Sequence, residues 1–355
     1  GSALFDGECV AMIISAVATG TAVVLIAGAL QGVFALPMKF ARRWNYENIW
    51  LIFAVTGLVI FPWILTSVTV PHLASVYRAT PAATLIAIAG FGLCWGIGAT
   101  LTGLGLNMLG IGLGLAIILG LSASVGSLIP LLVLTPEKID TYQGHIYLVG
   151  TAIMLLGIAC GARAGFLREK ENQTTLSQAG GFKKGSFFAG LLVVTASGLL
   201  SSALNFCYAF GGAAMTAAKH FGVSSIWSSN VITALAVTGG FFANLIYCVY
   251  LLRKNFTAKL FWVQELRMNW IYGAIMGACW FGGQALYGLG VSRMGNFGTV
   301  LGWPLLMGTI IVTSNAAGFL TGEWKGTMLR SRLYLLSGMA LIIAALGILA
   351  LGHRG

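Results

Sequence analysis

The sequence predicts an all-α polytopic membrane protein in which ten transmembrane helices form a 5+5 inverted-topology repeat. Three observations predict this fold class: an apolar composition, recurring apolar runs of membrane-spanning length, and self-similarity between the two halves. Of the 355 residues, 58% are hydrophobic and only 8% are charged. A soluble domain carries about 25% charged residues. A lipid bilayer is therefore the solvent that this composition fits.

The apolar runs are long enough to cross a bilayer. A hydrocarbon core of ~30 Å requires roughly 20 apolar residues in a helix. Because lipid offers no hydrogen-bond partners, each run is predicted to be a helix that satisfies its own backbone. The ten expected spans are 12–37, 48–71, 82–108, 110–134, 146–166, 185–210, 227–252, 270–291, 294–320 and 332–351.

The two halves of the chain resemble each other. CWGIGATLTGLG (94–105) corresponds to CWFGGQALYGLG (279–290), and 8 of the 17 positions from Cys94 to Gly110 match the residue 185 further on. NIWLIFAVTG (48–57) likewise corresponds to NVITALAVTG (230–239), and ALQGVFALP (29–37) to ALNFCYAFG (203–211). Such self-similarity indicates an internal repeat.

Five spans per repeat is an odd number, so the second repeat must cross the membrane in the opposite sense. Inverted repeats are typical of secondary transporters, with the substrate site near the midplane between the repeats. We expect a first repeat at 9–166, a cytoplasmic linker at 167–184 and a second repeat at 185–352.

The net charge of +11 is distributed unevenly between the two expected membrane faces. Five of the 20 Lys and Arg residues fall on the face that carries both termini, and the other 15 lie in or beside the opposite connections. An excess of Lys and Arg marks cytoplasmic loops. The charge therefore predicts topology, with both termini periplasmic, and secondarily contact with membrane lipids. Nucleic acid is not an expected partner.

The sequence offers no motif for an enzyme, a metal or a cofactor. The six cysteines form no CxxC pair, which argues against a zinc or redox site. Neither HExxH nor GxSxG occurs. No cofactor is expected, and the cysteines within the spans are interpreted as small apolar residues.

Five segments resemble one known family. They are ALPMKFARRWNYENIW (35–50), CWGIG (94–98), RAGFLREK (163–170), GWPLLM (302–307) and TGEWKG (321–326). In this order and spacing, from about residue 29 to 351, the chain is similar to the bacterial L-rhamnose–proton symporters of the drug/metabolite transporter superfamily. The resemblance implies ten helices, a place in the bacterial inner membrane, and uptake of a small neutral sugar coupled to protons.

Aromatic and amide side chains at helical spacing are the candidate sugar-binding residues. Tyr and Trp offer an apolar face for sugar C–H groups and a polar tip for hydroxyls, and residues three or four apart share a helix face. The nine candidates are Gln31, Trp95, Asn205, Tyr208, Trp280, Gln284, Tyr287, Thr299 and Trp303. Gln31 and Asn205 occupy equivalent repeat positions, which indicates a shared central cavity, but both amides could instead join helices.

Proton coupling lacks an obvious residue. Proton relays normally use an intramembrane Asp, Glu or His, and none lies near the middle of an expected span. Glu47, which opens the second span, and Glu323, which follows the ninth, are the remaining candidates, both at cytoplasmic helix ends. The coupling residue is therefore left open.

Two other functions stay open beside sugar uptake. The superfamily also contains exporters and exchangers of other small metabolites and drugs. A membrane scaffold without transport is the third possibility, against which the polar stripes at the repeat interface argue. The identity of the sugar, the direction of transport and the oligomeric state are not determined by the sequence.

Overall fold

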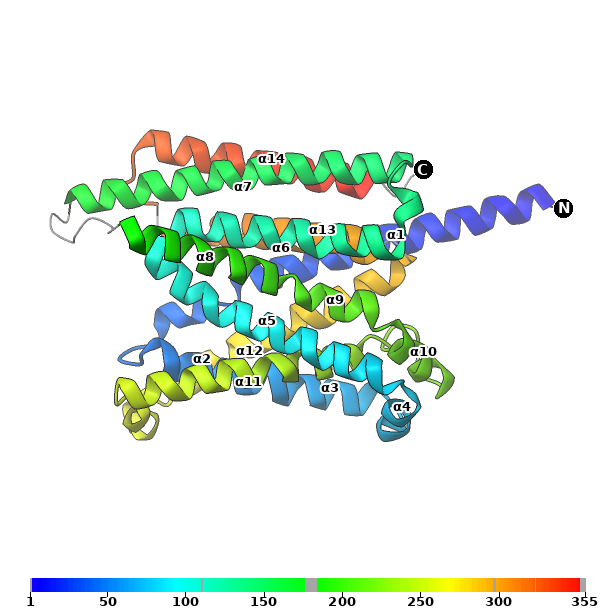
Figure 1. Cartoon of the computed structure of the whole chain (residues 1–355), viewed down its shortest axis with the longest axis horizontal. Helices are drawn as coiled ribbons and strands as arrows, with labels where there is room; N and C mark the ends of the chain where they lie inside the picture. Colours follow the sequence, from blue (N-terminus) through cyan, green and yellow to red (C-terminus); the bar gives the residue numbers. More distant parts are fainter. Residues whose placement is uncertain (1, 110, 176–183, 296–297, 323, 352–355) are drawn as a thin grey trace.

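The computed structural model describes residues 2–109, 111–175, 184–295, 298–322 and 324–351. Within these residues all regular secondary structure is helical, and Figure 1 shows long helices packed side by side in one bundle. The α-helices are α1 (Ser2–Val33), α2 (Tyr46–Val55), α3 (Phe61–Thr69), α4 (Leu73–Ala79), α5 (Ala82–Leu109), α6 (Ile111–Leu134), α7 (Tyr142–Thr175), α8 (Lys184–Ser201), α9 (Ala203–Phe210), α10 (Gly212–His220), α11 (Asn230–Lys254), α12 (Met268–Arg293), α13 (Gly298–Leu320) and α14 (Leu329–Leu351).

Short turns connect or interrupt these helices. A π-helical turn (Thr56–Ile60) joins α2 to α3, so that the three elements form one continuous rod. Short 3₁₀ turns lie at Leu36–Phe40, Pro136–Lys138, Ala258–Trp262 and Gln264–Leu266. The rod made of α2 and α3 and the pair α8 and α9 each occupy one expected span.

The multi-pass class predicted from composition is confirmed. Nine segments of the described residues are long and apolar enough to cross a membrane. They cover every expected span except 270–291, which coincides with α12. Helix α12 carries several glycines together with Gln284, and many of its side chains are buried against other helices. Small and polar residues are common where membrane helices pack against each other, and they lower the apolar character of α12. The assignment of α12 as the tenth span therefore stays a prediction.

The first turn of α1 and the last turn of α14 lie at the same end of the bundle, at the right in Figure 1. We call this the terminal end. The end of α7, the start of α8 and the end of α11 lie at the opposite end. Because Arg168, Arg253 and Lys254 belong to these segments, we call it the basic end.

Glycines of the CWGIG and CWFGG segments allow close helix packing. A Cβ atom on Gly98 of α5 would lie 2.9 Å from the backbone N of Ser201, at the end of α8. A Cβ atom on Gly283 of α12 would lie 2.8 Å from the backbone O of Ala27 in α1. Small residues permit such backbone approach between membrane helices. These two glycines are therefore packing residues of the α5–α8 and α1–α12 pairs.

We expect Gly98→Leu to destabilise the protein by roughly 1–3 kcal/mol, because a side chain there must push α8 away from α5. Gly103→Leu on the same helix is the matched control, since nothing lies within 4 Å of a Cβ atom at that position. The measurement is the unfolding temperature in detergent. Equal temperatures for the two variants would contradict the packing role of Gly98.

Candidate functional site

A cavity of about 250 Å³ lies in the middle of the bundle. Both halves of the chain contribute to its wall. The lining residues are Gln31, Phe34, Trp50, Phe53, Trp95, Ala99, Thr102, Ile118, Leu119, Ser122, Ser201, Leu204, Asn244, Trp280, Gln284, Trp303, Met307 and Ile310. We call it the central cavity. Its mixture of aromatic rings, amides and aliphatic side chains is typical of a small-molecule site.

Two indole rings form one part of this wall. Trp95 of α5 and Trp280 of α12 are stacked, with ring centroids 5.1 Å apart and planes inclined by 24°. Trp280 and Phe53 also form a T-shaped pair, with ring centroids 6.1 Å apart and planes at 89°. These contacts fix the orientation of Trp280, so the indoles present a rigid aromatic surface to the cavity.

A chain of hydrogen-bonded side chains leads away from the cavity. Gln31 Nε2 donates to Gln284 Oε1 at 3.0 Å, and Gln284 Nε2 donates to the Tyr208 hydroxyl at 3.1 Å. The Tyr208 hydroxyl is 2.8 Å from Thr233 Oγ1. Gln31 and Gln284 are both buried, and a buried amide requires such partners. The chain orients both amides at the cavity wall.

A second buried network lies beside the first, nearer the terminal end. Tyr287 OH donates to Asn205 Oδ1 at 2.5 Å, and Asn205 Nδ2 lies 2.8 Å from Gly126 O and 3.0 Å from Thr299 O. Pro130 stands inside α6 and has no N–H to donate to the carbonyl four residues earlier. That carbonyl belongs to Gly126, so Asn205 supplies the hydrogen bond that Pro130 cannot.

The nine candidate sugar-binding residues divide into two groups. Five of them line the central cavity: Gln31, Trp95, Trp280, Gln284 and Trp303. The other four, Asn205, Tyr208, Tyr287 and Thr299, are not among the lining residues. The helices α9 and α12 run toward the terminal end and α13 runs away from it (Figure 1). Each of the four therefore lies closer to the terminal end than a lining residue of its own span.

Trp303 belongs both to the wall of the central cavity and to the second buried network. Its indole Nε1 donates to Ser122 O of α6 at 2.9 Å, and its ring meets the Tyr287 ring edge-on, with centroids 5.6 Å apart. Trp303 is 2% exposed, so only a small part of its ring can face the cavity. It joins the cavity wall to the buried network of Asn205 and Tyr287.

Several lining residues were not predicted from the sequence. Trp50 and Phe53 of α2 line the cavity, and Trp50 Nε1 donates to Asn244 Oδ1 of α11 at 2.9 Å. The sequence carried a signal for them, because Trp50 and Phe53 are three residues apart, as Gln284 and Tyr287 of α12 are. Asn244 is an amide well inside an apolar span, which is also a signal of a polar site.

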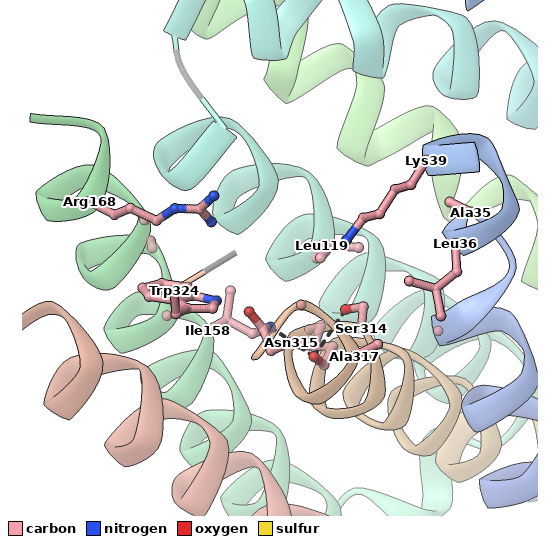
Figure 2. A pocket seen from close by; sticks show the side chains of 16 residues that line it. Ala35, Leu36, Lys39, Leu119, Ile158, Arg168, Ser314, Asn315, Ala317 and Trp324 are labelled. Carbon is pink, nitrogen blue, oxygen red and sulfur yellow. Dashed lines mark hydrogen bonds between the residues drawn. The ribbon is translucent and has the colours of Figure 1, made fainter. Parts of the chain in front are cut away.

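A second cavity of about 320 Å³ lies toward the basic end and shares Leu119 with the central cavity. Figure 2 shows Lys39 and Arg168 reaching toward it from different helices. Lys39 Nζ donates to Thr321 Oγ1 at 2.8 Å, and the Arg168 guanidinium lies 5.0 Å from the ring centroid of Trp324. Glu323, the neighbour of Trp324, lies outside the described residues. The two cavities therefore adjoin each other at Leu119, with the second one nearer the basic end.

Glu47 lies away from both cavities. Its Oε1 accepts hydrogen bonds from Asn255 Nδ2 at 3.0 Å and Thr257 Oγ1 at 2.7 Å. Among the carboxylates whose side chains the structure describes, Glu47 is the one that is buried, with 2% exposed. It ties the start of α2 to the segment after α11, and no described carboxylate lines the central cavity.

Within the part of the chain that the structure describes, no three His, Cys, Asp or Glu residues form a group that could hold a metal ion. The site is built instead from aromatic rings, amides and hydroxyls. Such groups bind a neutral polyhydroxylated molecule by stacking and hydrogen bonding.

The chain was compared with known proteins. A family model described as L-rhamnose-proton symport protein (RhaT) matches residues 13–355. The L-rhamnose-proton symporter of Cronobacter sakazakii is 29% identical over 340 residues, covering 92% of this chain and 95% of the relative. The L-rhamnose-proton symporter of Yersinia pestis is 27% identical over 340 residues, covering 92% of this chain and 96% of the relative. The chain therefore belongs to the L-rhamnose-proton symport protein (RhaT) family, a family of transporters and not of enzymes, as the resemblance implied.

Proposed function

We propose that this protein takes up L-rhamnose or a closely similar monosaccharide together with protons, and that the central cavity binds the sugar. The observation that carries the proposal is the wall where the stacked Trp95 and Trp280 lie next to the hydrogen-bonded Gln31 and Gln284. The indoles can cover the C–H faces of a pyranose ring. The amides can donate to and accept from its hydroxyls. Family membership supports the same substrate class.

We further propose that the ten spans form two inverted repeats that work by alternating access. The packing supports this, because helices at equivalent repeat positions pair in equivalent ways: α1 with α12 and α8 with α5, α1 with α13 and α8 with α6. Gly283 meets Ala27 as Gly98 meets Ser201. Binding sites between inverted repeats can be exposed to one side at a time when one repeat rocks against the other.

In this proposal the structure is closed at the terminal end and opens toward the basic end. The network of Asn205, Tyr287 and Trp303 blocks the terminal side of the central cavity. The other side adjoins, at Leu119, the cavity that Lys39 and Arg168 line (Figure 2). If the basic end is cytoplasmic, as its positive charges favour, and the membrane is the bacterial inner membrane, this is an inward-facing state.

The proposed function is tested with purified protein in liposomes and radiolabelled L-rhamnose. We expect accumulation driven by an inward proton gradient and lost on adding a protonophore. With one proton per sugar, a gradient of one pH unit sustains about tenfold accumulation, because one pH unit is worth ~1.4 kcal/mol.

The same assay addresses the coupling residue, for which Glu47 is our candidate among the described residues. Glu47→Gln would abolish accumulation but keep downhill exchange, whereas Glu265→Gln, at an exposed carboxylate, would change neither. If the liposomes move another metabolite or a drug but no monosaccharide, the exporter alternative is correct and the uptake proposal is wrong.

A further inference from the structure

The central cavity has two chemically different sides. The helices α6 and α13 pack against each other and contribute four aliphatic or thioether side chains to the wall: Ile118, Leu119, Met307 and Ile310. We call these the aliphatic wall. The amides of Gln31 and Gln284 and the stacked indoles come from other helices, α1, α5 and α12, and the third amide, Asn244, comes from α11. Figure 1 shows α6 and α13 in the layer next to α7 and α14, and α12 in the layer next to α2 and α11.

The aliphatic wall offers few hydrogen bonds. The polar groups that α6 and α13 bring to the cavity are Ser122 and the Trp303 indole. The Trp303 N–H is already donated to Ser122 O. Ser122 lies one turn from Ile118 along α6, on the terminal side, and Trp303 lies one turn from Met307 along α13, also on the terminal side. The wall nearer the basic end is therefore apolar.

This distribution distinguishes between sugars. A 6-deoxyhexose such as L-rhamnose has a methyl group where the corresponding hexose, L-mannose, has a hydroxymethyl group, and the two sugars agree at every other position. A methyl group gains from contact with aliphatic side chains. A hydroxyl placed there loses its water partners without replacement. An apolar pocket discriminates against an added hydroxyl by up to about 100-fold.

We propose that the aliphatic wall holds the C6 methyl group of a 6-deoxyhexose and thereby selects against hexoses with a hydroxyl at C6. The proposal rests on the proposed function, since it assumes that the central cavity binds the sugar. It also orients the sugar: the ring lies along Trp95 and Trp280, its hydroxyls face Gln31 and Gln284, and C6 points toward α6 and α13.

The test compares L-rhamnose with L-mannose as competitors of radiolabelled L-rhamnose uptake. For the unsubstituted protein we expect a half-inhibiting concentration of L-mannose about 10- to 100-fold above that of L-rhamnose. Met307→Gln places an amide on the wall at nearly constant side-chain length. It should reduce this ratio at least about fivefold, because the amide oxygen can accept a hydrogen bond from the C6 hydroxyl. Met307→Leu keeps the wall apolar and should leave the ratio unchanged.

Two further variants make the result decisive. Met268→Gln makes the same substitution at an exposed position at the start of α12 and should leave the ratio of half-inhibiting concentrations unchanged. Ile310→Asn, on the same wall, replaces Met307→Gln if that variant does not fold. If L-rhamnose is taken up but L-mannose competes equally well in the unsubstituted protein, the aliphatic wall is not a methyl site, while the proposed function stands. An unchanged ratio in folded Met307→Gln and Ile310→Asn also overturns the inference. Absence of any L-rhamnose uptake overturns both.

Discussion

Replacing Trp280 by alanine is expected to weaken L-rhamnose binding on the order of 30-fold, or about 2 kcal/mol. The indole is stacked on Trp95 and meets Phe53 edge-on, so its truncation removes the aromatic surface and leaves its neighbours without support. The measurement is the half-saturating concentration for sugar uptake, or the L-rhamnose dependence of the unfolding temperature.

Controls separate binding from folding in this prediction. A large-to-small change at a buried tryptophan costs about 3–5 kcal/mol of stability, so Trp280→Phe, which keeps a ring, is the second variant and should show a smaller loss of affinity. Trp262→Ala is the matched control, because Trp262 is 88% exposed and does not line the cavity. If folded Trp280→Phe and Trp280→Ala both bind L-rhamnose like the unsubstituted protein, the aromatic wall is not the sugar site.

Replacing Asn205 by leucine is expected to open the terminal end of the bundle. The substitution removes the hydrogen bonds to Gly126 O and Thr299 O and the acceptor for Tyr287 OH. Each buried group left unpaired costs about 1–3 kcal/mol, and a loss of 3 kcal/mol shifts a two-state equilibrium more than about 100-fold. The closed arrangement carries this cost, whereas a terminal-end-open arrangement would expose the same groups to water.

The measurement is the reactivity of a cysteine at Ser229, which is 2% exposed and lies beside Gly288 and Tyr208. Asn205→Leu should raise the rate at which a membrane-impermeant thiol reagent modifies this cysteine at least about tenfold, which is less than the change of about 100-fold in the equilibrium between the two arrangements. Tyr287→Phe should also raise the modification rate, but by less. Tyr77→Phe on α4 is the control, since it removes a hydrogen bond to Val231 O of α11 and breaks none of the hydrogen bonds of the network. If the cysteine at position 229 is modified only when the whole protein unfolds, and not in the folded Asn205→Leu variant, there is no gate at this place.

The sequence predicted the course of the chain well, because hydropathy is a local property. Runs of apolar residues mark helices in lipid wherever they occur, and nine of the expected spans coincide with segments of suitable length and composition in the described residues. The span at α12 shows the limit of hydropathy. Glycines and Gln284 lower the apolar character of α12, which packs against other helices. The run 270–291 is nevertheless among the ten expected spans, and the repeat and the resemblance point to it as well.

The candidate site was predicted in part. Helical spacing predicts that Trp280, Gln284 and Tyr287 share one face of α12, and in the structure all three are buried. Their role in binding a sugar stays a prediction. The same rule, had it been applied to α2, would have added Trp50 and Phe53. Spacing along one helix cannot tell which of its residues meets a cavity and which meets another helix.

What the sequence by itself determined was the helical membrane fold, the charge asymmetry between its ends, and the family. The tertiary structure alone decided the depth at which the cavity ends. Tyr287 lies one turn beyond Gln284 along α12, yet it donates to Asn205 whereas Gln284 lines the cavity. The reason is that α6 approaches α9 at this level: Pro130 frees the Gly126 carbonyl, Asn205 binds it, and the helices converge there. Such convergence depends on residues far apart in the chain, which no local pattern records.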